Sequence, residues 1–375
     1  MKRVEIYGNQ FNVIGPGGQH RSLMVARGLA KHYGYEVYLV TPRFRARYED
    51  VVARPQYFLD LQVFAGSVVV RIKSYLANGL ALPIRAATEV PAIVVLPSPI
   101  FRANVSVVKK LKGQLVVFDF GDVWYSPRDP RLYKVLSTWY LAAVVDRFVD
   151  YLVMPTRALA EFARRLMPER LRDKVLHIPS SIDTDVIRPA RKSDRPRVAY
   201  VGSLVGRGIE MLPYIAREVA RRCGGAEFVV VGEGPLKAWL EHKAADLGLG
   251  KAFTFVGGVE FERLPEVCGD CWIGLSLVRE STIYPVDVLK SLLYMALAMP
   301  IVSSIYIEEA ENVMIKVPPT AGSFAETICK LIKDDTLRGE LSARARARAV
   351  NAYDIRHIAG KYYSLLRRTN NKVKT

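Results

Sequence analysis

The sequence contains no long hydrophobic run. Among its 375 residues there is no stretch of about 18 uncharged apolar residues, the length that a membrane-spanning helix needs. The longest apolar stretch, residues 139–154, is interrupted by Asp146, Arg147 and Asp150. The N-terminal residues MKRVEIYG lack the apolar core of a secretory signal peptide. We therefore expect a cytoplasmic protein without a transmembrane helix.

Cysteine, asparagine and glutamine are also scarce. Four cysteines are too few for a disulfide framework. Cys268 and Cys271 form a single CxxC pair without a second pair or clustered histidines, whereas a structural zinc ion needs about four ligands. We interpret this pair as packing residues or an optional crosslink. Few Asn and Gln beside 54 Lys and Arg are typical of a thermophile, in which intracellular disulfides do occur.

Acidic residues are outnumbered by basic ones, and the net charge is +17. The excess is spread over the chain and forms no helical stripe with base-reading residues, so we expect no nucleic acid as a partner. Two basic clusters stand out, at residues 43–48 and at Lys109, Lys110 and Lys112. They suit an anionic membrane surface or an anionic substrate; exposed, solvated loops are the alternative interpretation.

Short β-rich runs alternate with amphipathic helical windows along the whole chain. This alternation predicts α/β folding, with parallel sheets covered by helices. The polar, proline-bearing segment 183–197 has no apolar period and is interpreted as a linker. It divides the chain into two Rossmann-like units of similar size, at residues 1–185 and 186–350.

Glycine clusters follow several predicted strands. The first, which includes Gly17 and Gly18, matches neither the dinucleotide GxGxxG pattern nor a P-loop. Others begin at Gly202, Gly232 and Gly257. Such turns expose backbone N–H groups at helix N-termini, where a phosphate is favoured. Tight turns that require glycine, with Pro235 as a helix start, are the alternative.

Six segments in order resemble motifs of the GT-B glycosyltransferases of family 4, the retaining nucleotide-sugar-dependent group. They are the GPGGQHRSLMVARGLAKHYGYEVYLVT, IPSSID, AYVGSLVGRGIEML, VVVGEGPLKAWLE, FTFVGGV and YPVDVLKSLLYMALAMPIV segments. The resemblance runs along almost the entire chain.

This resemblance implies two Rossmann-like domains that face each other across a cleft. The nucleotide sugar would bind mainly to the C-terminal domain and the acceptor to the N-terminal domain. The last helix, within residues 351–375, would cross back to the N-terminal domain. No cofactor or metal is implied, because side chains and helix dipoles stabilise the departing diphosphate. The donor would be a UDP- or GDP-sugar, and the acceptor a lipid-linked molecule or a glycan.

Two positions near the second unit's first glycine turn carry the implied diphosphate contacts. Arg207 stands where the family has a lysine, and a guanidinium can bond two phosphate oxygens. We take it as a catalytic residue. Ser203 replaces an expected arginine and would donate one hydrogen bond. Glu233 follows the third glycine turn and is included among the donor-binding candidates.

The family's Glu-x7-Glu motif is absent. Leu293 stands at the second glutamate, which would hold the ribose, and Pro285 precedes it by eight residues. Glu280 and Asp287 are the candidate replacements, although Asp287 also suits a helix N-cap. Lys290 matches a lysine of the family motif and would face phosphate.

In the first unit, FDFGDVW resembles the family's "D.HD.W" segment, with Gly121 in place of the histidine. Asp119 and Asp122 follow a predicted central strand, at the carboxyl end where open α/β sheets bind ligands. Asp122 is the catalytic candidate that would contact the acceptor hydroxyl. A turn or helix cap is the alternative role.

These features predict a hexosyltransferase that retains configuration and contacts an anionic membrane peripherally at the inner face. The losses at Ser203, Gly121 and Leu293 favour a second hypothesis, a catalytically degenerate GT-B protein that acts as a binding or partner subunit. A nucleotide-sugar epimerase shares the architecture, but the order of the motifs follows the transferases.

Overall fold

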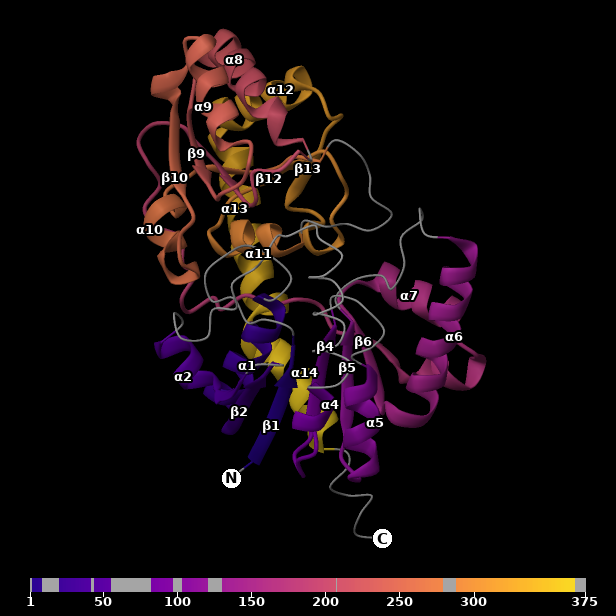
Figure 1. Cartoon of the computed structure of the whole chain (residues 1–375). Helices are drawn as coiled ribbons and strands as arrows, with labels where there is room; N and C mark the ends of the chain where they lie inside the picture. Colours follow the sequence, from indigo (N-terminus) through magenta and orange to yellow (C-terminus); the bar gives the residue numbers. More distant parts are fainter. Residues whose placement is uncertain are drawn as a thin grey trace. The chain divides into compact units, whose positions relative to one another are not determined.

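The computed structural model describes residues 2–8, 20–41, 44–54, 82–96, 103–120, 130–206, 208–278 and 288–367. They form two compact units (Figure 1). Unit 1 comprises the described residues up to Ser180 together with the helix that begins at Ile355, and unit 2 comprises Ser181–Asp354. Each unit contains a largely parallel sheet with helices packed on it, which confirms the predicted α/β class with two Rossmann-like units.

The sheet of unit 1 has the order β3-β2-β1-β4-β5-β6-β7 among the described strands. Neighbouring strands are parallel except β2 and β3. The strands are β1 (Lys2–Tyr7), β2 (Tyr35–Val40), β3 (Arg45–Arg47), β4 (Ala92–Leu96), β5 (Val116–Phe120), β6 (Tyr151–Met154) and β7 (Val175–His177). Buried runs of β-branched residues such as those of β5 are typical of parallel strands covered on both faces.

The helices of unit 1 are α1 (His20–Tyr33), α2 (Tyr48–Ala53), α4 (Leu82–Arg85), α5 (Ala103–Leu111), α6 (Arg131–Phe148), α7 (Arg157–Leu166) and α14 (Ile355–Arg367). α14 packs against α1, so that the end of the chain completes the N-terminal unit. A Cβ on Gly28 of α1 would lie 2.5 Å from Cβ of Ala359, and one on Gly360 would lie 2.4 Å from the Tyr33 hydroxyl. Glycine at both positions permits this close approach.

The sheet of unit 2 has the order β10-β9-β8-β11-β12-β13, and all its neighbouring strands are parallel. The strands are β8 (Arg197–Val201), β9 (Glu227–Val231), β10 (Phe253–Gly257), β11 (Ile273–Ser276), β12 (Ile301–Ser303) and β13 (Met314–Lys316). The short strand β13 was not predicted, because three residues carry too little periodicity to be recognised.

The helices of unit 2 are α8 (Leu212–Cys223), α9 (Lys237–Asp246), α10 (Leu264–Cys268), α11 (Val288–Ala296), α12 (Ala321–Lys333) and α13 (Asp335–Arg348). α8 and α12 pack together over one hydrophobic core. α10, α11 and the end of α13 contribute to a second core, which includes the inward side chains of β8 and β9. The sheet is therefore covered on both faces.

A disulfide joins Cys223 of α8 to Cys329 of α12, 106 residues apart. Cys268 and Cys271 are free thiols, and both are buried. The crosslink thus involves the two cysteines that show no motif in the sequence. The CxxC pair serves as packing residues, the first of the two interpretations.

The first residues of the segment interpreted as a linker are packed within unit 2. Asp183, Thr184 and Ile187 are buried. The Thr184 hydroxyl donates to the carboxylate of Asp354, and Arg346 donates to the carbonyl oxygens of Thr184 and Ile187 at 3.0 and 2.9 Å. These partners fix the beginning of the segment, whereas Arg191 and Asp194 further along it are exposed, as expected of a linker.

The two basic clusters are largely neutralised within unit 1. Lys109 is fully buried, and its ammonium group lies 2.5 Å from a carboxylate oxygen of Glu5. Arg45 bonds the same carboxylate at 2.8 Å, and Arg47 pairs with Glu36. Lys110 pairs with Asp150 at 2.6 Å. Lys109 is therefore removed from the surface, whereas the side chain of Arg47 stays 57% exposed. Among the described helices, none has the length and hydrophobicity required to span a bilayer.

Candidate functional site

Unit 2 has a topological switch point between β8 and β11. From β8, the chain proceeds to β9 and β10 on one side, and later returns to place β11, β12 and β13 on the other side. Open α/β sheets bind ligands in the crevice outside the carboxyl ends of the strands at such a point. The turn that begins at Gly202 follows β8 directly, so it lies at this position.

Tyr294 of α11 holds the two central strands at this point. Its hydroxyl accepts a hydrogen bond from Val201 N–H at 2.8 Å and donates to Leu275 O at 3.0 Å. A Cβ on Gly274 would lie 2.4 Å from the Tyr294 ring, so only glycine leaves room for the ring against β11. The backbone pairing of β8 with β11 involves Val198 and Ala199, and further along β8 the tyrosine side chain bridges the strands instead.

Three glycine turns stack at the carboxyl ends of β8, β9 and β10. A Cβ on Gly232 would lie 1.9 Å from Gly202 O, and Gly232 N–H donates to Gly257 O at 2.8 Å. Gly202, Gly232 and Gly257 all have positive φ, of 152°, 142° and 84°. Gly232 is required because its turn touches the Gly202 backbone, which is the tight-turn interpretation, and the positive φ favours glycine at all three positions. The contacts of Gly232 with Gly202 and Gly257 bring all three turns together at the carboxyl ends of the strands.

Lys290 extends from α11 to the first of these turns. Its Nζ lies 4.8 Å from the centroid of the Tyr200 ring and 3.4 Å from the position that a Cβ on Gly202 would occupy. The Tyr200 hydroxyl donates to Ser203 O at 3.2 Å, and Ser203 is exposed. A cation is therefore held beside an exposed turn at the switch point, an arrangement suited to an anionic ligand.

Glu233, in the turn after β9, reaches the turn after β10. Its carboxylate accepts hydrogen bonds from Gly258 N–H at 3.3 Å and from the Lys237 ammonium at 3.2 Å. Its side chain is 59% exposed. The geometry gives Glu233 a role in fixing this turn, and through it the position of Gly257.

Glu210 bonds the backbone directly after position 207. Gly208 N–H donates to one oxygen of its carboxylate at 2.9 Å, and a Cβ on Gly206 would lie 3.1 Å from the other oxygen. Gly208 has a φ of 126°, which disfavours any residue with a side chain. The turn before α8 is thus held by its own carboxylate.

The structure brings six of the candidate residues together at the carboxyl ends of the strands of unit 2. They are Gly202, Ser203, Gly232, Glu233, Gly257 and Lys290. Six other candidates lie outside the described residues, namely Gly17, Gly18, Asp122, Arg207, Glu280 and Asp287. Their assigned roles stay predictions. Leu293 is buried among the apolar residues of the second core and directs no polar group to the site.

Asp119 of unit 1 is fully engaged in a buried network. Nε of Arg21 donates to its two carboxylate oxygens at 3.0 and 3.1 Å, and the Tyr362 hydroxyl donates to one of them at 2.6 Å. Arg21 also donates to Ile178 O at 2.6 Å. The carboxylate therefore connects α1, β5 and α14, and its role is structural.

Sequence analysis missed Tyr200 and Tyr294 as residues that build the site. Tyr200 precedes the glycine turn by two residues, and Tyr294 follows the expected glutamate position within the YMA segment. Aromatic residues at such positions are ordinarily assigned to the core. The available signal was the hydroxyl group, because a buried tyrosine hydroxyl requires a hydrogen-bond partner.

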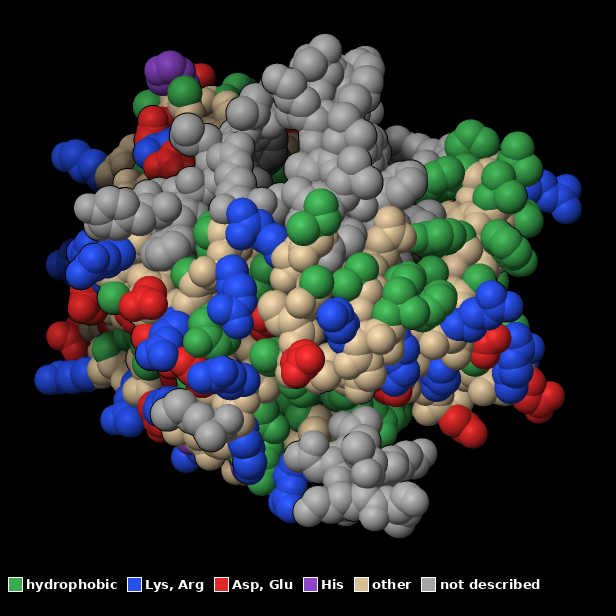
Figure 2. Space-filling model, turned by 60° about the horizontal axis from the view of Figure 1, so that its bottom comes forward, with side chains coloured by type: hydrophobic (Ala, Val, Ile, Leu, Met, Phe, Trp, Pro, Cys, Tyr) green, Lys and Arg blue, Asp and Glu red, His purple; other side chains and the backbone are tan. Residues whose placement is uncertain are grey.

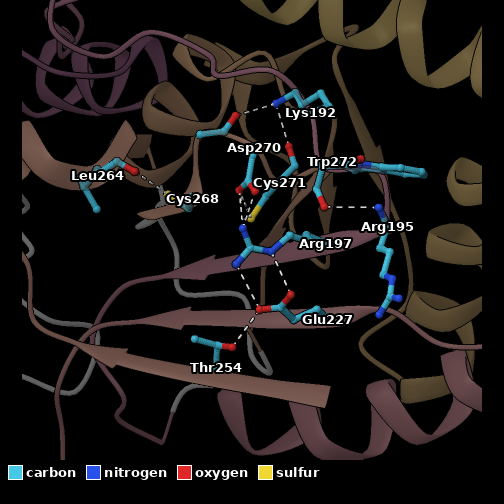
Figure 3. A network of polar contacts seen from close by, with 12 residues as sticks. Lys192, Arg195, Arg197, Glu227, Thr254, Leu264, Cys268, Asp270, Cys271 and Trp272 are labelled. Atoms are coloured by element: carbon cyan, nitrogen blue, oxygen red, sulfur yellow. Dashed lines mark hydrogen bonds and ion pairs between the residues drawn. The ribbon is translucent and has the colours of Figure 1, made fainter. Parts of the chain in front are cut away.

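A separate polar network lies at the amino ends of the strands of the same sheet (Figure 3). Arg197 donates to Asp270 at 2.6 Å and to Glu227 at 3.1 Å. Lys192 donates to three backbone carbonyl oxygens at 2.7–3.1 Å, and burial lowers its pKa to about 8. Burial raises the pKa of Cys268 to about 12, so its thiol is unreactive. This network joins strand starts and loops, away from the glycine turns.

Within the described ranges, no group of three or more His, Cys, Asp or Glu side chains is arranged to hold a metal ion.

Part of this chain resembles known glycosyltransferases in sequence. Residues 195–334 match the family model described as "Glycosyl transferases group 1". The chain is 35% identical over 101 residues to the GDP-mannose-dependent alpha-(1-6)-phosphatidylinositol monomannoside mannosyltransferase of Mycobacterium tuberculosis strain H37Rv, which is 24% of this chain and 26% of that protein. It is 24% identical over 232 residues to the alpha-D-kanosaminyltransferase of Streptomyces kanamyceticus, which is 57% of this chain and 59% of that protein. The matches thus span about a quarter of the length of the mycobacterial relative and somewhat over half of the length of the Streptomyces relative.

The fold has solved counterparts. Anabaena Alr3699/HepE, crystallised in complex with UDP, superposes with a TM-score of 0.66 at 12% identity, covering 98% of this chain and 99% of that one. This similarity confirms the GT-B fold, and the match of residues 195–334 confirms the resemblance to group 1 glycosyltransferases that the motifs indicated.

Proposed function

We propose that this chain, a GT-B protein that resembles the group 1 glycosyltransferases, transfers a hexose from a nucleotide sugar to an acceptor. The observation that carries the proposal is the ammonium group of Lys290, held beside the Gly202 turn at the switch point of unit 2. The same unit contains the family match. A crevice of this kind with a fixed cation suits the diphosphate of a nucleotide sugar.

The donor is a UDP- or GDP-sugar. UDP is bound by HepE, whose fold this chain shares, and the mycobacterial relative is named as GDP-mannose-dependent. Lys290 supplies one positive charge for the diphosphate, and Arg207 supplies a second from the turn in which Gly208 N–H is bonded to Glu210. Cations placed where negative charge develops lower the barrier to departure of the nucleotide.

The reaction retains the configuration of the sugar. An acceptor hydroxyl attacks the anomeric carbon on the face from which the nucleotide leaves, and the bond from that carbon to the diphosphate oxygen breaks. The departing diphosphate takes the proton of the acceptor hydroxyl. Asp122 contacts that hydroxyl, and the acceptor is a lipid-linked molecule or a glycan at the inner face of the membrane. This reaction requires no cofactor or metal, because side chains stabilise the leaving group.

Binding of nucleotides to the purified protein tests the donor proposal. A saturating donor nucleotide stabilises a protein by about 2.7 kcal/mol when its concentration is 100 times the Kd. We expect UDP or GDP to raise the Tm, and ADP to raise it less. Incubation with a panel of nucleotide sugars, followed by analysis of the product and its anomeric configuration, then identifies the sugar and the stereochemistry.

A second function is favoured by Leu293, which fills the position of the ribose-binding glutamate with a buried apolar side chain. A protein that lacks this carboxylate would bind the donor weakly and serve as a binding or partner subunit. Absence of any Tm shift at millimolar UDP, GDP or their sugars would support this alternative and refute the transferase proposal.

A further inference from the structure

Helix α6 exposes an apolar stripe to solvent. Leu132, Val135, Leu136 and Trp139 are 69, 58, 55 and 70% exposed. Their spacing of three, four and seven residues places them on one side of the helix. Figure 2 shows hydrophobic side chains gathered on the right, the side on which α6 lies in Figure 1, with Lys and Arg side chains near them. Contiguous exposed patches of this kind mark interaction surfaces more often than scattered single residues do.

The core does not account for this stripe. The buried residues of α6 are Ser137, Leu141, Val144 and Val145, which lie on its other side. A helix on the surface of a domain needs one apolar face to pack, and the opposite face is ordinarily polar. α6 has apolar residues on both faces, so its exposed stripe serves a purpose other than folding of unit 1.

The charges on α6 favour an anionic partner. The first turn carries Arg131 and Lys134, and the first fifteen residues of the helix contain no acidic residue. Cations at a helix N-terminus oppose the helix dipole, and no side-chain cap compensates there. The end of the helix that presents the apolar stripe therefore also carries positive charge, which suits an anionic partner.

We propose that α6 is a peripheral docking surface for a bilayer that contains anionic phospholipid. Leu132, Leu136 and Trp139 would enter the region between headgroups and acyl chains, where tryptophan is favoured, while Arg131 would face the phosphates. A second copy of the chain is the less suitable occupant, because each copy carries a net charge of +17. The inference deepens the proposed function by naming the surface that brings the transferase to a membrane-borne acceptor. Only the statement that the acceptor is membrane-borne rests on the proposed function; the docking surface itself does not.

Flotation of the whole protein with lipid vesicles tests the proposal. Vesicles of phosphatidylglycerol and phosphatidylcholine should carry the protein, and pure phosphatidylcholine vesicles should carry much less. The double variant Leu136→Ser/Trp139→Ser should reduce partition by about tenfold or more, because it removes apolar area that enters the membrane. Arg131→Gln should reduce binding to the anionic vesicles by about fivefold. Leu111→Ser is the matched control, since Leu111 is 78% exposed at the end of α5.

Each other outcome overturns the proposal. The first is that no vesicle carries the protein; the second is that the double variant floats as well as the wild type and Leu111→Ser. The third is a dimer in sedimentation equilibrium that the double variant dissociates, which would identify a second copy as the occupant. Far-UV circular dichroism and Tm establish that the variants are folded. The Tm shift with UDP or GDP reports on the proposed function separately, because the α6 variants leave unit 2 unchanged.

Discussion

The ammonium nitrogen of Lys290 lies 4.8 Å from the centre of the Tyr200 ring. The ring is itself oriented, because the Tyr200 hydroxyl donates to Ser203 O at 3.2 Å. A flexible lysine side chain is thereby directed toward the turn after β8. This cation comes from a helix ninety residues further along the chain, so the site forms only when α11 packs against β8 and β11.

Replacing Lys290 with alanine should weaken binding of the donor nucleotide. Loss of one charged contact to the diphosphate should raise the Kd for UDP or GDP by about tenfold, since such a hydrogen bond is worth about 1.5–3 kcal/mol. Isothermal titration calorimetry measures the Kd. Lys333→Ala is the control, because Lys333 is an exposed lysine at the end of α12. Equal affinities for the two variants would remove Lys290 from the diphosphate site.

The Arg207→Ala variant should lower turnover with the preferred nucleotide sugar by about tenfold or more. Arg207→Lys should recover part of the loss, because one positive charge returns without the second hydrogen bond. Single-turnover kinetics separates this effect from product release. Arg344→Ala, an exposed change on α13, should leave turnover unaltered. Wild-type kinetics in Arg207→Ala would exclude this guanidinium from catalysis.

The Tyr294→Phe variant should be less stable by about 1–3 kcal/mol. The change leaves Val201 N–H and Leu275 O without their shared partner at the switch point. Urea denaturation measures the free energy of unfolding, and the Kd for the nucleotide reports on displacement of the Gly202 turn. Tyr214→Phe on the partly exposed surface of α8 is the matched control. Identical stability of the two variants would refute the bridging role.

Reduction of the Cys223–Cys329 disulfide should destabilise unit 2. The bond closes a long loop and connects α8 to α12, and loss of such a crosslink costs about 2–4 kcal/mol. A thiol reductant should therefore lower the Tm of the wild type. It should not affect the Cys223→Ala/Cys329→Ala variant, in which only the free thiols remain. A reductant effect of the same size in both proteins would show that another process is responsible.

The stability of unit 1 should fall as the pH decreases from about 6.5 to about 4. Burial, together with the positive charges of Lys361, Arg157 and Arg21, lowers the pKa of His177 from 6.5 to about 4. Within this window the unfolded chain binds a proton that the folded protein does not, so acidification favours unfolding. After allowance for solvent screening the effect is roughly 1–2 kcal/mol.

The His177→Gln variant should lose part of this pH dependence. Tm measured at intervals from pH 7 to pH 4 should decline less steeply in His177→Gln than in the wild type. His357→Gln, at an exposed position on α14, should decline as the wild type does. Parallel curves for all three proteins would exclude His177 as the source.

Sequence patterns predicted the alternation of strands and helices in unit 2, because each amphipathic period lies within one continuous segment. They failed where the decisive partner lies far along the chain. Lys109 was counted as part of a basic surface, yet its partner Glu5 is 104 residues away and both are buried. A sequence shows a charge but not the opposite charge that folding brings to it.

The sequence alone determined the α/β class, the two units and the glycine turns that follow β8, β9 and β10. These depend on the periodicity of neighbouring side chains and on backbone conformations that only glycine adopts readily. The tertiary structure decided that Gly202, Gly232 and Gly257 meet at one edge, that Lys290 reaches the first turn and that Tyr294 joins two strands. It also decided which face of α6 is exposed on the protein surface. Such relationships depend on how elements pack, because burial and proximity are properties of the assembled sheet and helices rather than of any single segment.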